Sequence, residues 1–267
     1  AAAWDDGGFA LMYRTFADVG SDLAANELAC EWMTRKIASI VDDPAVAAAL
    51  TPSHPYGTKR PPSATGWYEA FNHAHVELVD LRATPIVGVE PGGVATTAGL
   101  HPVDVIVMAT GFDAITGAYT RVDIRGSGGR ELREVWASGP DTYLGVAVAG
   151  FPNMFMVAGP HTPAGNLPPG AQEQATWIAG LIEDMRRRGV AAREPSEQAQ
   201  KEWKRFLDAT GEASLVRFGA RANSWFTGSN IEGKAFSYTL FFGGANVHAD
   251  MCDDEAAEGY PGFRDVG

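Results

Sequence analysis

The sequence predicts an α/β fold, and three stretches of the chain support that class. The run Val103–Ala109, within VDVIVMATG, is apolar on both faces and ends in a glycine loop, as a central strand of a parallel sheet does. A second apolar run, Met154–Ala158, also has the character of a buried strand. Residues 171–189, AQEQATWIAGLIEDMRRRG, combine an apolar helical stripe with three arginines and a terminal glycine, which indicates an amphipathic helix. In such folds ligands bind at the loops that follow the strands.

Three further helices are predicted from capping residues and helical spacing. Over residues 22–41 the apolar side chains recur near helical spacing, and either residue of the Ser21–Asp22 pair can cap the first turn. A shorter helix over 45–50 follows Pro44, which suits a first helical turn. Another helix is expected from about Ser196 to Asp208.

Strands and turns are predicted after the first helices. Residues 54–62, HPYGTKRPP, contain three prolines, which restrict the backbone and leave an extended linker and a plausible domain boundary. Beyond it, Val76–Arg82, Ile86–Val89 and Val103–Ala109 have the composition of strands separated by turns. The tail carries aromatic and glycine-rich pieces and ends in an acidic segment, Asp250–Glu258.

The charge and the apolar pattern of the chain argue against several classes of partner. Its 267 residues carry 21 Lys plus Arg against 33 Asp plus Glu, a formal net charge of −12, which argues against binding to nucleic acid. No apolar run approaches the roughly 20 residues of a membrane span, and the first residues lack a signal-peptide pattern, so we expect a cytoplasmic protein. Cys30 and Cys252 are far apart, so neither a disulfide framework nor a structural zinc site is predicted.

Two motifs of nucleotide-binding proteins are incomplete or missing. Gly228–Lys234, GSNIEGK, matches the first seven positions of a P-loop, but Ala235 follows the lysine where a magnesium-binding hydroxyl is needed. No G-x-G-x-x-G motif occurs, so the chain lacks the turn that brings a helix amino terminus against a pyrophosphate.

The six histidines have no cluster of carboxylates or thiols beside them, and we interpret them as surface or hydrogen-bonding residues rather than metal ligands.

Lys59 and Arg60 are adjacent cations on a proline-stiffened loop of an acidic chain. Such a pair can hold a phosphate or stabilise a developing anion, and an arginine keeps its charge in any pocket. A solvated linker charge is the competing interpretation. Trp225 offers an indole donor and a flat face to an aromatic ligand, although a tryptophan more commonly belongs to a core.

Six segments carry a family resemblance that spans nearly the whole chain: GGFALMYRTFADVGSDLAAN, YGTKRPP, VDVIVMATGFDAITGAYTRVDIRG, GPDTYLGVAVAGFPNMFMVAGP, NLPP and SWFTGSNIEGK. In this order they resemble the carboxyl-terminal half of a Baeyer–Villiger monooxygenase, a class B flavoprotein monooxygenase similar to cyclohexanone and phenylacetone monooxygenases. The resemblance implies an enzyme that binds FAD and NADPH and uses O2 to convert ketones to esters or lactones through a C4a-peroxyflavin.

The resemblance also implies a domain organisation. It predicts the carboxyl-terminal portions of two dinucleotide-binding, Rossmann-like domains and the end of a helical insertion. Residues 1–56 would be the end of that insertion, 57–112 the second half of the NADP-binding domain, and 113–267 the carboxyl-terminal part of the FAD-binding domain with its substrate loop. Both glycine-rich fingerprints would lie in an amino-terminal half that is missing here. We therefore interpret the chain as a fragment that is inactive alone and whose partner is that half.

The site residues follow from the same resemblance. Arg60 corresponds to the active-site arginine, whose permanent charge stabilises the anionic peroxyflavin and the oxyanion formed from the ketone. Lys59 would meet the phosphate side of NADP, and Trp225 would contact the nicotinamide end. The substrate loop comprises Ala164, Gly165, Asn166 and Leu167. Of these, Leu167 would also face the flavin, and the small Ala-Gly pair suggests a roomier ketone pocket.

Two other functions stay open at this point. One is an N-hydroxylating or other flavin monooxygenase, and the other is a non-catalytic remnant or binding module. Replacing Arg60 distinguishes ketone oxidation from N-hydroxylation. Ester formation needs the anionic peroxyflavin that Arg60 would stabilise, so the replacement should abolish ester formation while NADPH oxidation stays measurable. If half of each sheet is missing, apolar strands such as Val103–Ala109 should be exposed to water, and the isolated chain should associate or dissolve poorly.

Overall fold

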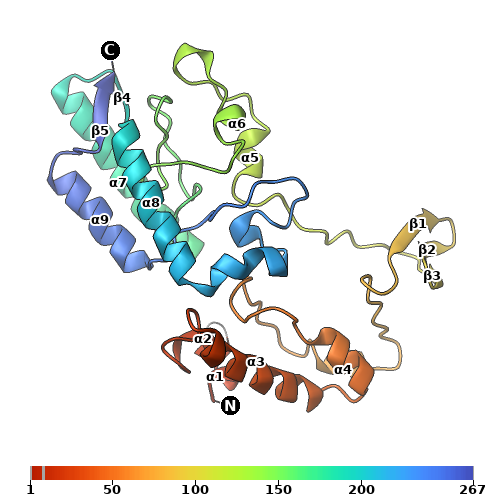
Figure 1. Ribbon diagram of the computed structural model, residues 1–267. Coiled ribbons are helices and arrows are strands. Elements are labelled where there is room, and N and C mark those ends of the chain that lie inside the picture. The colour runs from red at the N-terminus through yellow and green to blue at the C-terminus, as the bar shows by residue number, and fades with distance from the viewer. Residues whose placement is uncertain (1, 8–9, 267) are drawn as a thin grey trace. The chain divides into compact units, whose positions relative to one another are not determined.

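The computed structural model describes residues 2–7 and 10–266; Ala1, Gly8, Phe9 and Gly267 lie outside the described residues, and Gly8 and Phe9 fall in the first family-like segment. The chain divides into two compact units (Figure 1). The first unit comprises residues 1–19, 23–56 and 61–111, and the second comprises 20–22, 57–60 and 112–267. The short piece with Lys59 and Arg60 therefore belongs to the second unit.

Helices make up the first part of unit 1. They are α1 (Ala2–Asp5), α2 (Ala10–Tyr13), α3 (Leu23–Ala38), α4 (Pro44–Leu50) and the 3₁₀ turn η1 (Glu69–Asn72). Of these, the sequence predicts α3 and α4. Helix α4 begins with Pro44 in its first turn, and the Asp43 carboxylate accepts hydrogen bonds from the N–H groups of Ala45 and Val46. The buried Asn26 side chain ties α3 to residue 56, because it donates to the carbonyl of Tyr56 and accepts from its N–H.

A three-stranded antiparallel sheet follows in unit 1. It consists of β1 (Ile86–Glu90), β2 (Gly93–Thr96) and β3 (Gly99–Pro102), in that order across the sheet. The strand expected at Ile86–Val89 is thus confirmed. At Gly93 the backbone has φ +152°, and a Cβ there would lie 2.1 Å from the carbonyl oxygen of His101, so only glycine fits this close strand pairing.

Two expected strands of unit 1 do not form, and this corrects the sequence prediction. Residues 76–82 are turns and irregular backbone. Residues 103–109 are also irregular, and Val105, Val107 and Met108 are 77%, 83% and 77% exposed. A strand needs a neighbour for its N–H and C=O groups, and within the part of the chain that the structure describes none pairs with 103–109. The expected exposure of this apolar run is confirmed.

Unit 2 holds most of the chain and its largest helices. Its elements are α5 (Gly117–Thr120), η2 (Ser127–Gly129), α6 (Leu132–Val135), α7 (Leu167–Arg188), β4 (Ala192–Pro195), α8 (Glu197–Ala213), η3 (Leu215–Ala222), η4 (Trp225–Thr227), α9 (Ala245–Ala257) and β5 (Phe263–Val266). Strands β4 and β5 form a two-stranded antiparallel sheet.

In unit 2 the structure confirms the two predicted helices, corrects the start of the first, and shows no strand at 154–158. Helix α7 ends where expected, with Gly189 in the left-handed conformation at φ 68°, but it begins at Leu167, since the two prolines that follow fit a first turn. Helix α8 begins after Ser196, whose hydroxyl accepts from the N–H of Ala199. The acidic tail is helical, as α9. The strand expected at 154–158 is reduced to one bridge between Phe155 and Ala147.

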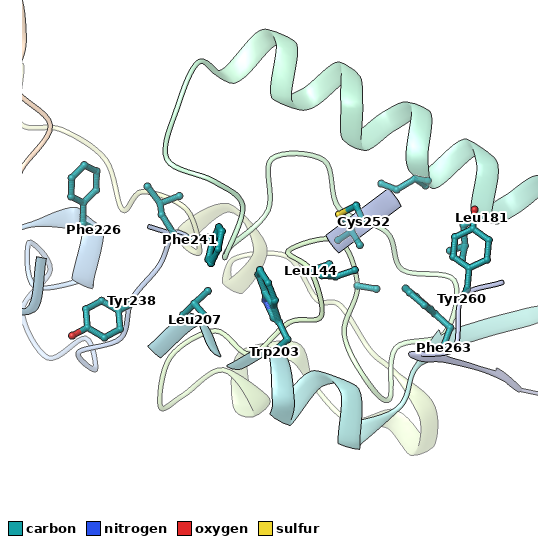
Figure 2. Packing of buried hydrophobic residues seen from close by; sticks show 14 of the residues in the cluster. Leu144, Leu181, Trp203, Leu207, Phe226, Tyr238, Phe241, Cys252, Tyr260 and Phe263 are labelled. Carbon is teal, nitrogen blue, oxygen red and sulfur yellow. The ribbon is translucent and has the colours of Figure 1, made fainter. Parts of the chain in front are cut away.

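The core of unit 2 lies among these helices. Helices α7 and α9 contact each other, and β4 pairs with β5 beside them (Figure 1). Trp203 of α8 is 2% exposed, and its ring lies 5.2 Å from that of Phe241. Figure 2 shows these rings together with Leu207 in the middle of the cluster. Burying such rings and aliphatic side chains supplies the main driving force for the folding of this unit.

Among the helices that the structure describes, none combines the length and the apolar character that crossing a membrane requires.

Candidate functional site

One extended segment, residues 237–241, brings two of the predicted site segments together. On one side it pairs with residues 161–164 through the backbone. The N–H of Ala164 donates to the carbonyl of Phe241 at 3.1 Å, and the N–H of Phe241 donates to the carbonyl of Thr162 at 2.9 Å. This parallel pairing holds the start of the predicted substrate loop in one register.

The other side of the same segment holds Trp225. The N–H of Thr239 donates to the carbonyl of Phe226 at 2.9 Å, and the Thr239 hydroxyl donates to the carbonyl of Trp225 at 3.2 Å. Trp225 opens the 3₁₀ turn η4, which Ser224 caps through its hydroxyl. Its ring is half-buried and lies 4.5 Å from the ring of Phe226 in an edge-to-face arrangement. Trp225 and the predicted substrate loop are therefore attached to one segment.

The predicted substrate loop lies at the amino terminus of α7. Ala164 is half-buried, whereas Gly165, Asn166 and Leu167 are exposed. Asn166 occupies the capping position, but its side chain caps no N–H group of the helix. Because Pro168 and Pro169 have no N–H group, the N–H of Leu167 is the first donor of the helix, and it has no side-chain acceptor from Asn166. A Cβ at Gly165 would meet no atom within 4 Å, so the space beside it is open.

A cavity of about 740 Å³ opens beside this helix end. Three of the predicted residues line it, namely Gly165, Asn166 and Leu167. Further lining residues that sequence reasoning missed come from α7 and α9: Trp177, Ala245, His248, Ala249, Cys252 and Asp253. The sequence signal that could have revealed them is the helical spacing of residues 245, 248, 249 and 252, which was hidden by the acidic composition of the tail.

His248 and Cys252 form the buried wall of the cavity. The ring Nε2–H of His248 donates to the carbonyl of Leu144 at 2.9 Å, and its Nδ1 lies 3.7 Å from the Cys252 sulfur. Burial lowers the pKa of His248 and raises the pKa of the Cys252 thiol to about 12. Both groups are neutral at physiological pH, so this thiol is not poised as a nucleophile. Together they provide a largely uncharged surface.

Lys59 and Arg60 belong to the same compact unit as the cavity and Trp225. Lys59 is half-buried and Arg60 is exposed, and they follow Thr58, which is completely buried and anchors this short piece. Their roles at a cofactor stay predictions. Across the described residues, no three side chains of His, Cys, Asp or Glu gather closely enough to hold a metal ion.

Comparison with known proteins reveals close relatives, although no family model matches the sequence. A Baeyer–Villiger monooxygenase of Pseudooceanicola batsensis is 38% identical over 261 residues, which are 97% of this chain and 47% of that protein. A phenazine N-monooxygenase of Lysobacter antibioticus is 37% identical over 262 residues, covering 97% of this chain and 48% of that protein. The chain thus spans about half the length of the curated relatives it matches.

The solved structures decide which half is matched. Cyclohexanone monooxygenase from Rhodococcus sp. Phi1, solved with NADP+ bound, is 40% identical and superimposes with a TM-score of 0.94 over 100% of this chain and 50% of that one. The match falls on the carboxyl-terminal part. This chain is similar to the carboxyl-terminal half of a Baeyer–Villiger monooxygenase. The resemblance inferred from the six segments is confirmed, and so is the α/β fold class built from parts of dinucleotide-binding domains.

Proposed function

We propose that the chain contributes the substrate loop and part of the cofactor-binding residues of an NADPH- and O2-dependent flavin monooxygenase that converts ketones to esters or lactones. The observation that carries this proposal is the similarity to Baeyer–Villiger monooxygenases over 97% of the chain. The geometry agrees with it, since residues 237–241 hold the loop at 161–167 and Trp225 on one scaffold.

Arg60 is assigned the catalytic charge. Attack on a ketone carbonyl places negative charge on its oxygen, and a guanidinium keeps its proton at any physiological pH. A fixed cation near that oxygen lowers the barrier most where water is excluded. Lys59, the neighbouring cation, is assigned to a phosphate of NADP, where a point charge is sufficient.

The residues beside the cavity fit the ring of a flavin, which would supply the oxygen-activating redox chemistry when bound. Pro168 and Pro169 have no N–H group, so the start of α7 offers one uncapped amide donor, that of Leu167, to a carbonyl oxygen of such a ring. Leu167 and Trp177 offer apolar contacts to a flat aromatic system, and Trp225 is assigned to the nicotinamide end of NADP. The pyrophosphate of either cofactor lacks a glycine-rich cradle in this sequence.

A second polypeptide segment must therefore complete the cofactor sites. The partner we propose is the amino-terminal half of a Baeyer–Villiger monooxygenase, which would supply the two glycine-rich turns. The exposed run 103–109 offers it unpaired backbone and apolar side chains.

The test is a chimera in which the amino-terminal half of the Pseudooceanicola batsensis relative is joined to this chain. We expect the chimera to bind FAD, to oxidise NADPH in the presence of a panel of ketones, and to form esters or lactones. Arg60→Ala in the chimera should abolish ester formation while NADPH oxidation stays measurable. Equal ester formation by the variant would refute the role of Arg60, and a folded, flavin-loaded chimera without any ester product would refute the proposed reaction.

N-hydroxylation is the second candidate function, and the similarity to a phenazine N-monooxygenase supports it. Supplying phenazine in place of the ketone to the same chimera separates the two, because an N-oxide product is distinct from an ester. The third candidate, a non-catalytic binding module, is tested with the chain alone. Flavin retention and ketone-dependent NADPH oxidation by the isolated chain would contradict both that candidate and the need for a partner.

A further inference from the structure

We propose that Asp113 and Lys234 form a latch that fixes the loop Gly228–Lys234 and thereby positions Trp225. The loop is the sequence that resembles a P-loop but has Ala235 in place of the magnesium-binding hydroxyl residue. The structure gives its lysine a different partner, because the Nζ of Lys234 forms an ion pair with the Asp113 carboxylate. These two residues are 121 positions apart in the sequence, so the pair is a tertiary contact within unit 2.

A second hydrogen bond links the same two segments. The side-chain amide of Asn230 donates to the carbonyl of Phe112 at 3.3 Å. Phe112 therefore binds Asn230 of the loop, and the neighbouring Asp113 binds Lys234. A single exposed ion pair contributes little to the order of a loop, but two contacts at separate positions restrict both its place and its rotation.

Both members of the ion pair pack closely against a glycine. A Cβ on Gly117 would lie 2.6 Å from the Asp113 Cγ, so the carboxylate occupies space that only glycine leaves open. The Lys234 stem lies over Gly228, where a Cβ would approach its Cδ at 3.4 Å. Each side chain is only 20% exposed. Ordering them therefore costs less side-chain entropy than ordering two free surface chains.

Two other charged residues, Arg133 and Glu232, line the same cavity of about 310 Å³ as Asp113 and Lys234. Arg133 forms an ion pair with Glu131, whereas Glu232 lies in the loop itself, and the ion pair of Lys234 is with Asp113. Lys234 is thus the cation that the structure sets against Asp113.

The latch acts on Trp225 through a short, closed turn. The N–H of Ser237 donates to the carbonyl of Thr227 at 3.2 Å, and the N–H of Ser229 donates to the carbonyl of Ser224 at 3.0 Å. These bonds close the base of the loop immediately after Trp225. Releasing the far end of the loop at Lys234 therefore loosens the turn that carries the indole. Asp113 and Lys234 are positioning residues, and only the cofactor role of Trp225 rests on the proposed function.

Hydrogen exchange of the complete chain, without cofactors, tests the latch. The variants are Asp113→Asn, Lys234→Met and the double variant; the control is Asp123→Asn, which removes an exposed ion pair with Arg125 in the same unit. We expect each single variant to speed exchange in residues 224–235 by about 3- to 10-fold, and the double variant to exchange no faster than either single one. Peptides of α7 and the control should be unchanged.

Three results would overturn the latch: no acceleration in 224–235, equal acceleration in α7, or independent, additive effects of the two substitutions. None of these readouts requires a cofactor or turnover, so they stand apart from the proposed reaction. In an active chimera, Asp113→Asn should raise KM for NADPH more than it lowers kcat. An unchanged KM together with faster loop exchange would leave the latch in place and remove Trp225 from the NADPH site.

Discussion

Single glycines set several close contacts of this molecule, and Gly211 in α8 is one of them. A Cβ at this position would lie 2.6 Å from ring atoms of Tyr238, which is buried and whose hydroxyl donates to the Glu212 carboxylate at 2.7 Å. The ring is held at both ends and has little room to move. The glycine therefore lowers the helix propensity of α8 but allows the helix to pack closely against residues 237–241.

Gly211→Ala should destabilise the chain despite improving helix propensity. Alanine favours a helix interior by about 1 kcal/mol, whereas overpacking costs about 1–3 kcal/mol, so we expect a net loss on the order of 1 kcal/mol. Urea denaturation followed by circular dichroism measures it. Gly170→Ala in α7 is the matched control, because its Cβ would meet nothing within 4 Å. A Gly211→Ala variant as stable as the control would show that the ring shifts freely.

The carboxyl-terminal strand is held to α7 and β4 by an ion-pair network. Arg193, which is 1% exposed, donates to Asp184 of α7 at 2.8 Å and to Asp265 of β5 at 2.8 Å. Hydrogen bonding from Arg193 lowers the pKa of the Asp184 carboxyl. A lowered carboxyl pKa contributes stability above the ordinary value of 3.8, and this stability is lost as the pH falls through the folded-state pKa.

Asp184→Asn should therefore destabilise the chain at pH 7, by an amount on the order of 2 kcal/mol, because it leaves a buried guanidinium with one anionic partner fewer. The difference from the parent chain should shrink as the pH approaches 3. Unfolding free energies measured from pH 7 to 3 test this. Glu197→Gln, which removes an exposed pair with Lys201, serves as the control and should have almost no effect. A pH-independent difference would contradict the assigned titration.

Exposed apolar surface favours self-association of the isolated chain. The run 103–109 presents its side chains and its unpaired backbone to water, which favours association of one copy with another. Val105→Lys combined with Val107→Lys should lower the association of the isolated chain, because charges oppose strand pairing between copies. Light scattering across a concentration series measures the average mass. Val122→Lys, a change at an exposed valine of unit 2, is the control. A parent chain that stays monomeric throughout would refute this prediction.

The site was only partly accessible from sequence. The predicted substrate loop and the predicted role of Trp225 come from motif resemblance, and the structure attaches both segments to residues 237–241. His248 and Cys252 were missed as cavity residues, because the acidic composition of the tail hid the helical spacing that places them on one face of α9. The partner of Lys234 was equally hidden, because a contact across 121 positions leaves no local pattern.

The sequence by itself determined features that depend on neighbouring residues or on recognisable motifs. These are helices α3, α4, α7 and α8, the turn at Gly189, and the resemblance to Baeyer–Villiger monooxygenases. Caps, prolines and helical spacing act within a few residues, so they can be read without a structure. Only the tertiary structure decided that residues 103–109 form no strand and that 237–241 joins the loop at 161–164 to Trp225. Strand pairing depends on a neighbour distant in sequence, and an apolar run forms a strand only where such a neighbour supplies its hydrogen bonds.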